Sequence, residues 1–198
     1  SQADDVSSLP GIELVRRKVR LLVAMAGRVP EGRSYNISED VVSARRVLAR
    51  WPVRILFSPW ELGARIETGA RLVSEGDPHS PVRVAFDTAM RQSDRNGRKS
   101  WDQVSVYAAI RESDPMFGRR RGWLKIADDA GRNPWEDSKE GPHALLVARE
   151  RPERIGETIE GLMAMRPRYA VRARSFSGAD AARPSVLMAN EANLAGTD

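Results

Sequence analysis

An α/β fold is predicted for this chain, with an open, mostly parallel sheet flanked by helices. A continuous apolar run at residues 19–27 is typical of a strand buried on both faces, and a second short strand is expected at 53–57. Between them, a helix is expected from about residue 39 to 50, behind Ser38 as its N-cap. Strands that alternate with helices indicate a parallel sheet, in which ligands bind beyond the carboxyl ends of the strands.

The next elements follow from turn residues and helical periodicity. The strand at 53–57 is entered from Trp51-Pro52, and it is followed by a loop at residues 58–61 and a short helix. A polar, basic loop at 94–99 then leads to Ser100, a good N-cap. The helix behind it has an apolar face formed by Val104, Ala108 and Ile110.

The carboxyl-terminal third predicts two strands and a helix. Residues 122–127 alternate like a strand and stop at 128–131, where two adjacent aspartates before a glycine indicate a turn rather than a metal pair. A late strand is expected at 144–147, and His143 in front of it is interpreted as structural. Pro152 then opens a helix whose apolar stripe consists of Ile155, Ile159, Leu162 and Met163.

Length and composition indicate one domain. We expect it to span residues 1–166, followed by a flexible tail at 167–198 that is rich in Ala, Arg, Ser and Gly. The sequence has 198 residues, 41% of them hydrophobic, and no cysteine, which excludes disulfides, thiolate metal sites and cysteine nucleophiles. No apolar stretch is long enough to cross a membrane, so a soluble protein is expected, with the cytoplasm favoured and secretion left open.

Asp102 is the leading candidate for chemistry. It lies in the first turn of its helix, near the positive end of the helix dipole and facing the polar loop. An acidic residue in that position also commonly compensates the dipole, so both interpretations stay open from this segment alone. Asn36 after the first strand and residues 58–61 after the second are expected at the same carboxyl edge of the sheet, which favours a ligand site there.

Taken together, these segments resemble the inosine-uridine preferring nucleoside hydrolase family, in its Trp-Asp branch. The resemblance is to the carboxyl-terminal half of that family and covers about residues 10–166. It is carried by the segments Met25-Ala26-Gly27, Tyr35-Asn36, Trp51-Pro52-Val53, Phe57-Ser58 and Ser100-Trp101-Asp102.

The resemblance implies hydrolysis of the N-glycosidic bond of ribonucleosides with a bound calcium ion. Asp102 matches the family's aspartate that ligates calcium and takes a proton from the attacking water. Asn36 matches an asparagine that hydrogen-bonds the ribose, and Tyr35 matches the aromatic residue beside it. Trp101 stands where many members carry a histidine, and an indole cannot protonate a leaving base. Trp60 and Glu61, on the ligand-side loop, are further candidates for substrate binding.

Two departures from the family pattern limit what the chain is expected to do alone. The family's amino-terminal aspartate cluster has no counterpart, although calcium requires roughly 6–8 oxygen ligands. Ser34 stands where the family has a ribose-binding glutamate, and Glu31 or Glu61 are the alternatives for that contact. We therefore expect the isolated chain to be inactive.

Three classes of function stay open at this point. The first is the calcium-dependent hydrolase, acting on a ribonucleoside or related riboside, and the second is a non-catalytic ligand-binding or scaffold protein of the same fold. The third is a basic nucleic-acid-associated protein, suggested by a net charge of +5 and the run Arg119-Arg120-Arg121. Because aromatic residues are not interleaved with the arginines, nucleic-acid binding is disfavoured. A membrane partner is not expected, and a homo-oligomer stays open.

Overall fold

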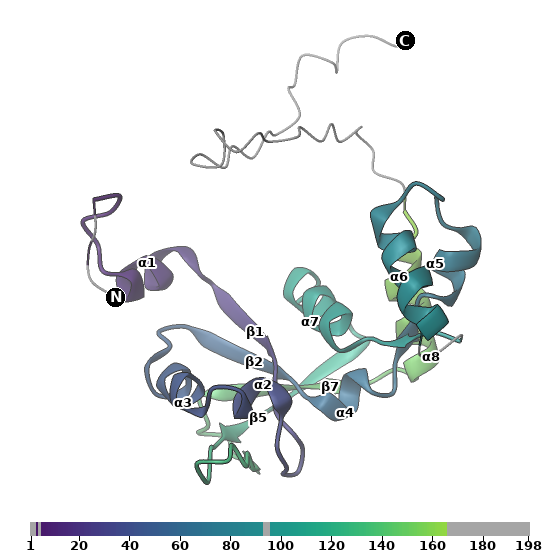
Figure 1. The fold of residues 1–198 in the computed structure, drawn as a ribbon. Helices are drawn as coiled ribbons and strands as arrows, with labels where there is room; N and C mark the ends of the chain where they lie inside the picture. Colours follow the sequence, from purple (N-terminus) through teal and green to yellow (C-terminus); the bar gives the residue numbers. More distant parts are fainter. Residues whose placement is uncertain (1–2, 4, 93–95, 166–198) are drawn as a thin grey trace. The chain divides into compact units, whose positions relative to one another are not determined.

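A five-stranded mixed sheet forms the centre of the domain in the computed structural model (Figure 1), which describes residues 3, 5–92 and 96–165. Its strands, in spatial order, are β1 (Leu21–Met25), β2 (Arg54–Ser58), β7 (His143–Ala148), β5 (Phe117–Leu124) and β6 (Trp135–Asp137). Strands β1, β2 and β7 are parallel, whereas β5 is antiparallel to both of its neighbours. The α/β prediction is confirmed, with the parallel pairing confined to one half of the sheet.

The remaining elements are eight helices and a small ribbon within the described residues. The helices are α1 (Gly11–Lys18), α2 (Tyr35–Ser38), α3 (Val41–Arg50), α4 (Trp60–Gly63), α5 (Ala70–Glu75), α6 (Pro81–Gln92), α7 (Trp101–Ile110) and α8 (Pro152–Met163). The antiparallel ribbon consists of β3 (Glu67–Thr68) and β4 (Arg98–Lys99). Residues 98–99 therefore belong to a paired strand, although the sequence predicted a polar loop there.

Helices cover both faces of the sheet (Figure 1). On one face, α7 and α8 contribute Val104 and Ile155, both fully buried, to a core that also contains Leu56 of β2. On the other face, α3 packs against Ile55 and Phe57 of the same strand. Strand β2 therefore supplies apolar side chains to both cores, as its nearly continuous apolar sequence predicts.

Three local expectations are corrected by the structure. The strand β1 is only half-buried along its whole length, because it lies at the edge of the sheet. The N-cap of α3 is Asp40, whose carboxylate accepts the N–H of Ser43 at 2.9 Å, and Ser38 instead ends α2. Ile110 is 75% exposed, so it does not extend the apolar face of α7.

Most expectations for the carboxyl-terminal third are confirmed. The turn at 128–131 forms, with the Gly131 N–H donating to the Asp128 carbonyl, and the late strand and the last helix are present. Strand β5 starts at Phe117, several residues earlier than predicted. In α8, Ile155 and Ile159 are buried, whereas Leu162 is 42% exposed and leaves the predicted stripe. The predicted tail at 167–198 lies outside the described residues.

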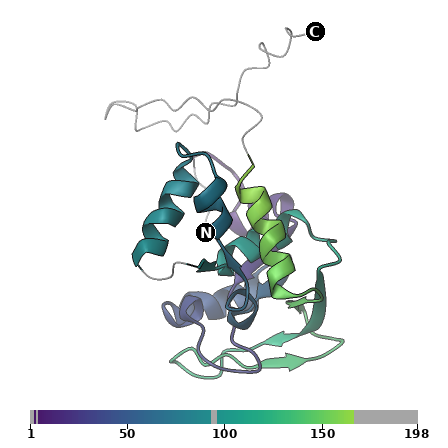
Figure 2. The ribbon, with the colours of Figure 1, turned by 90° about the vertical axis from the view of Figure 1, so that its right-hand side faces the viewer.

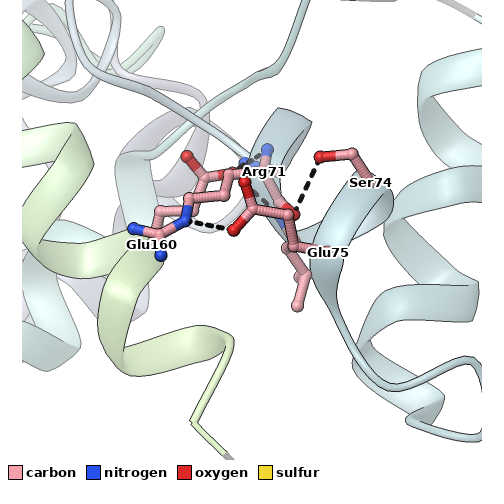
Figure 3. A network of polar contacts seen from close by, with 6 residues as sticks. Arg71, Ser74, Glu75 and Glu160 are labelled. Atoms are coloured by element: carbon pink, nitrogen blue, oxygen red, sulfur yellow. Dashed lines mark hydrogen bonds and ion pairs between the residues drawn. The ribbon is translucent and has the colours of Figure 1, made fainter.

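Helices α5, α6 and α8 lie side by side in both views (Figures 1 and 2). Glu160 of α8 joins two of them, because its Oε1 accepts the backbone N–H groups of Gly69, Arg71 and Leu72 at 2.8, 2.7 and 3.1 Å (Figure 3). The first N–H groups of a helix have no partner within it, so this carboxylate caps the six-residue α5 from another element.

Near the carboxyl end of α7, Tyr107 stabilises the turn that leads into β5. The Tyr107 hydroxyl donates to the Asp114 carboxylate at 2.6 Å. Burial and this hydrogen bond raise the pKa of Tyr107 to about 12. The same bond, together with the N–H of Met116, holds the pKa of Asp114 below its ordinary value.

Among the described residues, no helix has the length and apolar character required to span a membrane.

We predict that Glu160→Ala lowers the free energy of unfolding by about 1–2 kcal/mol, because three N–H groups lose one charged acceptor. The matched control is Glu157→Ala on the same helix, where the exposed carboxylate pairs, among the described residues, only with Arg154 at 3.5 Å. Urea unfolding of both variants measures the difference, and hydrogen exchange at Gly69 and Leu72 should accelerate only in Glu160→Ala. Equal losses in the two variants would contradict the capping role.

We also predict that Tyr107→Phe costs about 1 kcal/mol of stability at pH 7. A depressed folded-state pKa stabilises the protein above the unfolded pKa of Asp114 and loses that contribution as the pH falls through the folded value. The gap between variant and parent should therefore shrink below about pH 4. Urea midpoints at pH 7 and pH 3 test this, with Tyr35→Phe at an exposed position as the control. A gap independent of pH would show that packing alone is lost.

Candidate functional site

The carboxyl ends of β1 and β2 lie at the same level, because Met25 is in register with Ser58. The chain segments that follow the two strands are joined by backbone hydrogen bonds: Ala26 donates to the Ser58 carbonyl at 3.2 Å, and Trp60 donates to the Gly27 carbonyl at 3.0 Å. Gly27 has a φ of 100°, a conformation that side-chain-bearing residues rarely adopt. The loop after β1 and the short α4 are thereby placed next to each other.

Asn36 is tied to the end of β1. Its Nδ2 donates to the Met25 carbonyl at 2.8 Å and approaches the Met25 sulfur at 3.2 Å. No described residue donates to its Oδ1, so this oxygen can accept from a ligand. The sequence predicted Asn36 in a loop, whereas the structure places it in the first turn of α2. Tyr35 beside it is 72% exposed.

Two tryptophans form an aromatic wall at this edge. The Trp60 and Trp101 rings have centroids 6.0 Å apart with an interplanar angle of 31°. The Trp101 indole N–H donates to the Trp60 carbonyl at 3.0 Å, which holds the start of α7 against α4. The Arg28 guanidinium lies 3.8 Å from the Trp60 ring centre, in a cation–π contact. Sequence analysis missed Arg28, although its place directly after Gly27 at the end of β1 was a usable signal.

Glu61 holds the same loop in place. Its Oε2 accepts the Val29 N–H at 3.0 Å, and its Oε1 lies 3.5 Å from an Arg28 guanidinium nitrogen. Both oxygens thus have partners within the chain, and the role of Glu61 in substrate binding stays a prediction. Glu31, the other residue considered for the ribose contact, pairs with Arg132 at 3.0 Å.

Ser34, at the position of the family's glutamate, belongs to the folded core of this loop. It is 3% exposed, and its N–H donates to the Asn133 Oδ1 at 2.9 Å. Asn133 is fully buried, and its Nδ2 donates to the Arg28 carbonyl at 3.4 Å. Asn133 therefore ties the segment before β6 to two points of the loop between β1 and α2. Sequence analysis missed it, because a contact across 99 positions has no local signal.

Asp102 is exposed at the start of α7, with no hydrogen bond or ion pair to any described residue. Ser100 occupies the predicted N-cap position, but its hydroxyl bonds the Thr68 Oγ1 at 2.8 Å and does not cap the helix. The carboxylate thus stands in solvent at the positive end of a helix dipole. The neighbouring Trp101 belongs to the aromatic wall, whereas neither Asn36 nor Tyr35 makes a hydrogen bond or ring contact with that wall within the described residues.

The described residues do not assemble a metal site of their own, because they contain no group of three or more His, Cys, Asp or Glu side chains that could hold an ion. Asp102 supplies one carboxylate, and calcium requires several oxygens. Asp128 accepts the N–H groups of Ala130 and Arg132, as expected for a turn. Asp129 pairs with Arg45 at 2.7 Å.

His143 and Ser58 are buried polar residues near the centre of the sheet. His143 is 4% exposed, and its Nδ1 accepts the Leu124 N–H at 3.0 Å. Burial lowers the pKa of its imidazole, which favours the neutral ring and the structural interpretation. Ser58 was expected at the ligand side, but it is 1% exposed, and its hydroxyl has no hydrogen-bond partner among the described residues.

Comparison of the chain with models of known protein families and with curated proteins finds no match. The functional interpretation therefore depends on the residues and their geometry. What the structure places at the carboxyl edge is an aromatic wall, a tethered amide with a free acceptor oxygen, and an exposed carboxylate at a helix start.

We predict that Gly63→Ala displaces Trp101, because a Cβ at Gly63 would lie 2.5 Å from the Trp101 Cα. Backbone must move to relieve that contact, at a cost of about 1–3 kcal/mol. Circular dichroism of the coupled tryptophans should weaken, and urea unfolding should occur at lower concentration. The control is Gly161→Ala, where no atom lies within 4 Å of the added Cβ. An unchanged tryptophan signal in Gly63→Ala would contradict the close packing of α4 on α7.

Proposed function

We propose that this chain provides part of the site of a calcium-dependent N-ribosyl hydrolase, in a domain of the nucleoside-hydrolase type that acts on ribonucleosides or related ribosides. One observation carries the proposal: the carboxyl edge of the parallel strands holds Asn36, the Trp60–Trp101 wall and the start of α7 with Asp102. Ligands of α/β sheets bind at this edge. Supporting it, Asn36, Trp101 and Asp102 belong to the segments that carry the resemblance in the sequence.

The proposed chemistry assigns the proton transfer to Asp102. Cleavage of a ribosyl C–N bond passes through a state with positive charge on the sugar, so a water must be positioned and its proton accepted. An exposed carboxylate without a protein partner is free to accept that proton. The Glu61 carboxylate is less suitable, because its oxygens already contact the Val29 N–H and the Arg28 guanidinium.

The proposed substrate contacts use the amide and the aromatic wall. The Asn36 Nδ2 is held by the Met25 carbonyl, so its Oδ1 has a set direction in which to accept from a ribose hydroxyl. The tilted pair of Trp60 and Trp101 rings offers aromatic area on which a nucleobase can stack, beside the Arg28 guanidinium that lies over Trp60. Because the Trp101 N–H is already donated to a carbonyl, this residue contributes stacking and no proton for the departing base.

The calcium ion that the resemblance implies would orient the water and the sugar hydroxyls when bound. The described residues do not fit a complete calcium site, since they contain no group of three or more His, Cys, Asp or Glu side chains that could hold an ion. The proposal therefore gives Asp102 the role of one ligand and expects the others from outside the described residues. For the same reason, we expect that ribosides are hydrolysed no faster with this chain alone than without it.

A second candidate is a ligand-binding protein of the same fold without catalysis. The replacement of the family's glutamate by the buried Ser34 favours it, because a strong acceptor for a ribose hydroxyl is absent there. A nucleic-acid-associated protein is less well supported. Arg119 and Arg120 in the basic run are paired with Glu112 and Asp137.

We predict that the 198-residue chain binds inosine weakly in the presence of calcium, and that Asn36→Ala and Trp101→Ala each weaken binding about tenfold or more. Isothermal titration or NMR titration measures the affinity. Asp129→Ala is the control, because this exposed aspartate has its ion pair with Arg45 on the surface, away from the proposed contacts. A riboside site at this edge would be rejected if neither Asn36→Ala nor Trp101→Ala weakens binding, or if the chain binds neither inosine nor uridine.

Hydrolysis separates the two candidates. The test uses a protein in which other residues complete the calcium site. There, Asp102→Ala should lower turnover about 10²–10⁴-fold and weaken calcium binding, whereas Asp129→Ala should change neither. A nitrophenyl riboside, which leaves without protonation, should be a better substrate than inosine. If riboside binding is retained but turnover does not depend on Asp102, the non-catalytic candidate is correct.

A further inference from the structure

A cavity lined in part by arginines lies at the opposite end of the sheet from the proposed riboside site. It has a volume of about 380 Å³ and is lined by residues that include Leu21, Arg54, Leu56, Arg119, Arg121 and Ala144. Leu21 and Arg54 begin β1 and β2, and Ala144 lies at the start of β7. The cavity therefore opens at the amino ends of the three parallel strands.

The hollow has a simple origin in the side chains of the sheet. Ala144 pairs with Leu56 on one side and with Arg121 on the other, so a methyl group lies between two larger residues. Side chains two positions apart on a strand point to the same face, which places Arg119 and Arg121 together beside this gap. Helix α7, which covers the same face of the sheet further along, ends at Ile110.

Positive charge at the cavity exceeds the negative charge that faces it. Arg54 and Arg119 both lie 3.0 Å from the same Glu112 oxygen, Oε1. Burial acts to raise the pKa of Glu112, but hydrogen bonds from these two arginines outweigh it and hold that pKa below its ordinary value. Glu112 is thus ionised at neutral pH, and one carboxylate serves two guanidinium groups.

Arg121 has no carboxylate partner among the described residues. Its Nε donates to the Gly141 carbonyl at 2.7 Å, a neutral acceptor, which fixes the guanidinium and leaves its terminal nitrogens available. The three arginines and the single glutamate leave an excess of positive charge in the cavity. With Nε donated, the two terminal nitrogens of Arg121 form one edge that can donate two parallel hydrogen bonds to the paired oxygens of a phosphate.

We propose that this cavity binds an oxyanion of the phosphate class, with Arg121 as the principal contact and Arg119 beside it. The volume suits a phosphate group with a small organic part attached, since ligand pockets start at about 300 Å³. The proposal is independent of the riboside site, because the two lie at opposite ends of the same strands.

The geometry favours a small anion over a nucleic acid. Arg120, between the two cavity arginines, points to the other face of the sheet and pairs with Asp137 through two of its nitrogens. The basic run is therefore divided between two faces and does not form a continuous strip for a phosphate backbone.

The test is a titration of the 198-residue chain with inorganic phosphate, followed by NMR at the Ala144 methyl group and by calorimetry. Chloride at matched ionic strength controls for screening. We expect a saturable shift at Ala144 and at least tenfold weaker phosphate binding in Arg121→Gln. Arg120→Gln is the matched control, because it removes the same charge from the same strand on the opposite face, and it should leave phosphate binding unchanged.

A second variant tests the cavity without changing any charge. Ala144→Leu fills the gap between Leu56 and Arg121, so it should abolish phosphate binding while urea unfolding reports whether the fold is retained. The proposal is overturned if phosphate does not shift Ala144, or if Arg120→Gln and Arg121→Gln weaken binding equally. Tight binding of a single-stranded RNA that depends equally on both arginines would overturn it in favour of a nucleic-acid surface.

Discussion

The parallel pairing of β1 with β2 is the constraint on which the rest of the structure depends. Because Met25 is in register with Ser58, both strands end at the same level, and their loops must then leave the sheet together. The hydrogen bonds from Ala26 and Trp60 convert that register into contact between the loop after β1 and α4. Trp60 in turn holds Trp101, so the position of α7 depends on the register of β1 and β2.

Periodicity predicted most elements, because apolar spacing directly reflects which faces are buried. It could not predict the edge position of β1, since an apolar strand has the same sequence whether one or both of its sides are paired. The start of β5 was missed for a related reason. Arg119 and Arg121 occupy positions that a buried strand would fill with apolar residues, and here they line an open cavity.

The candidate site was predictable where a residue directly follows a strand or starts a helix. Asn36, Trp60 and Asp102 were identified on that basis, and the structure places each of them at a strand end or a helix start. Arg28 and Asn133 were missed because their roles depend on contacts between distant segments. Asn133 in particular is an ordinary polar residue in the sequence, and only its full burial shows that it joins two loops.

The net charge of +5 does not show which basic residues have a carboxylate partner and which do not. Most arginines named above have a carboxylate partner on the surface, and exposed pairs of this kind contribute little stability or specificity. Arg121 differs because its partner is a neutral carbonyl, so its charge remains directed into a cavity. Arg28 is intermediate, with Glu61 at 3.5 Å and an aromatic face beneath it. The number of charges therefore does not indicate where an anion can bind. The position of a positive charge without a close counter-charge does.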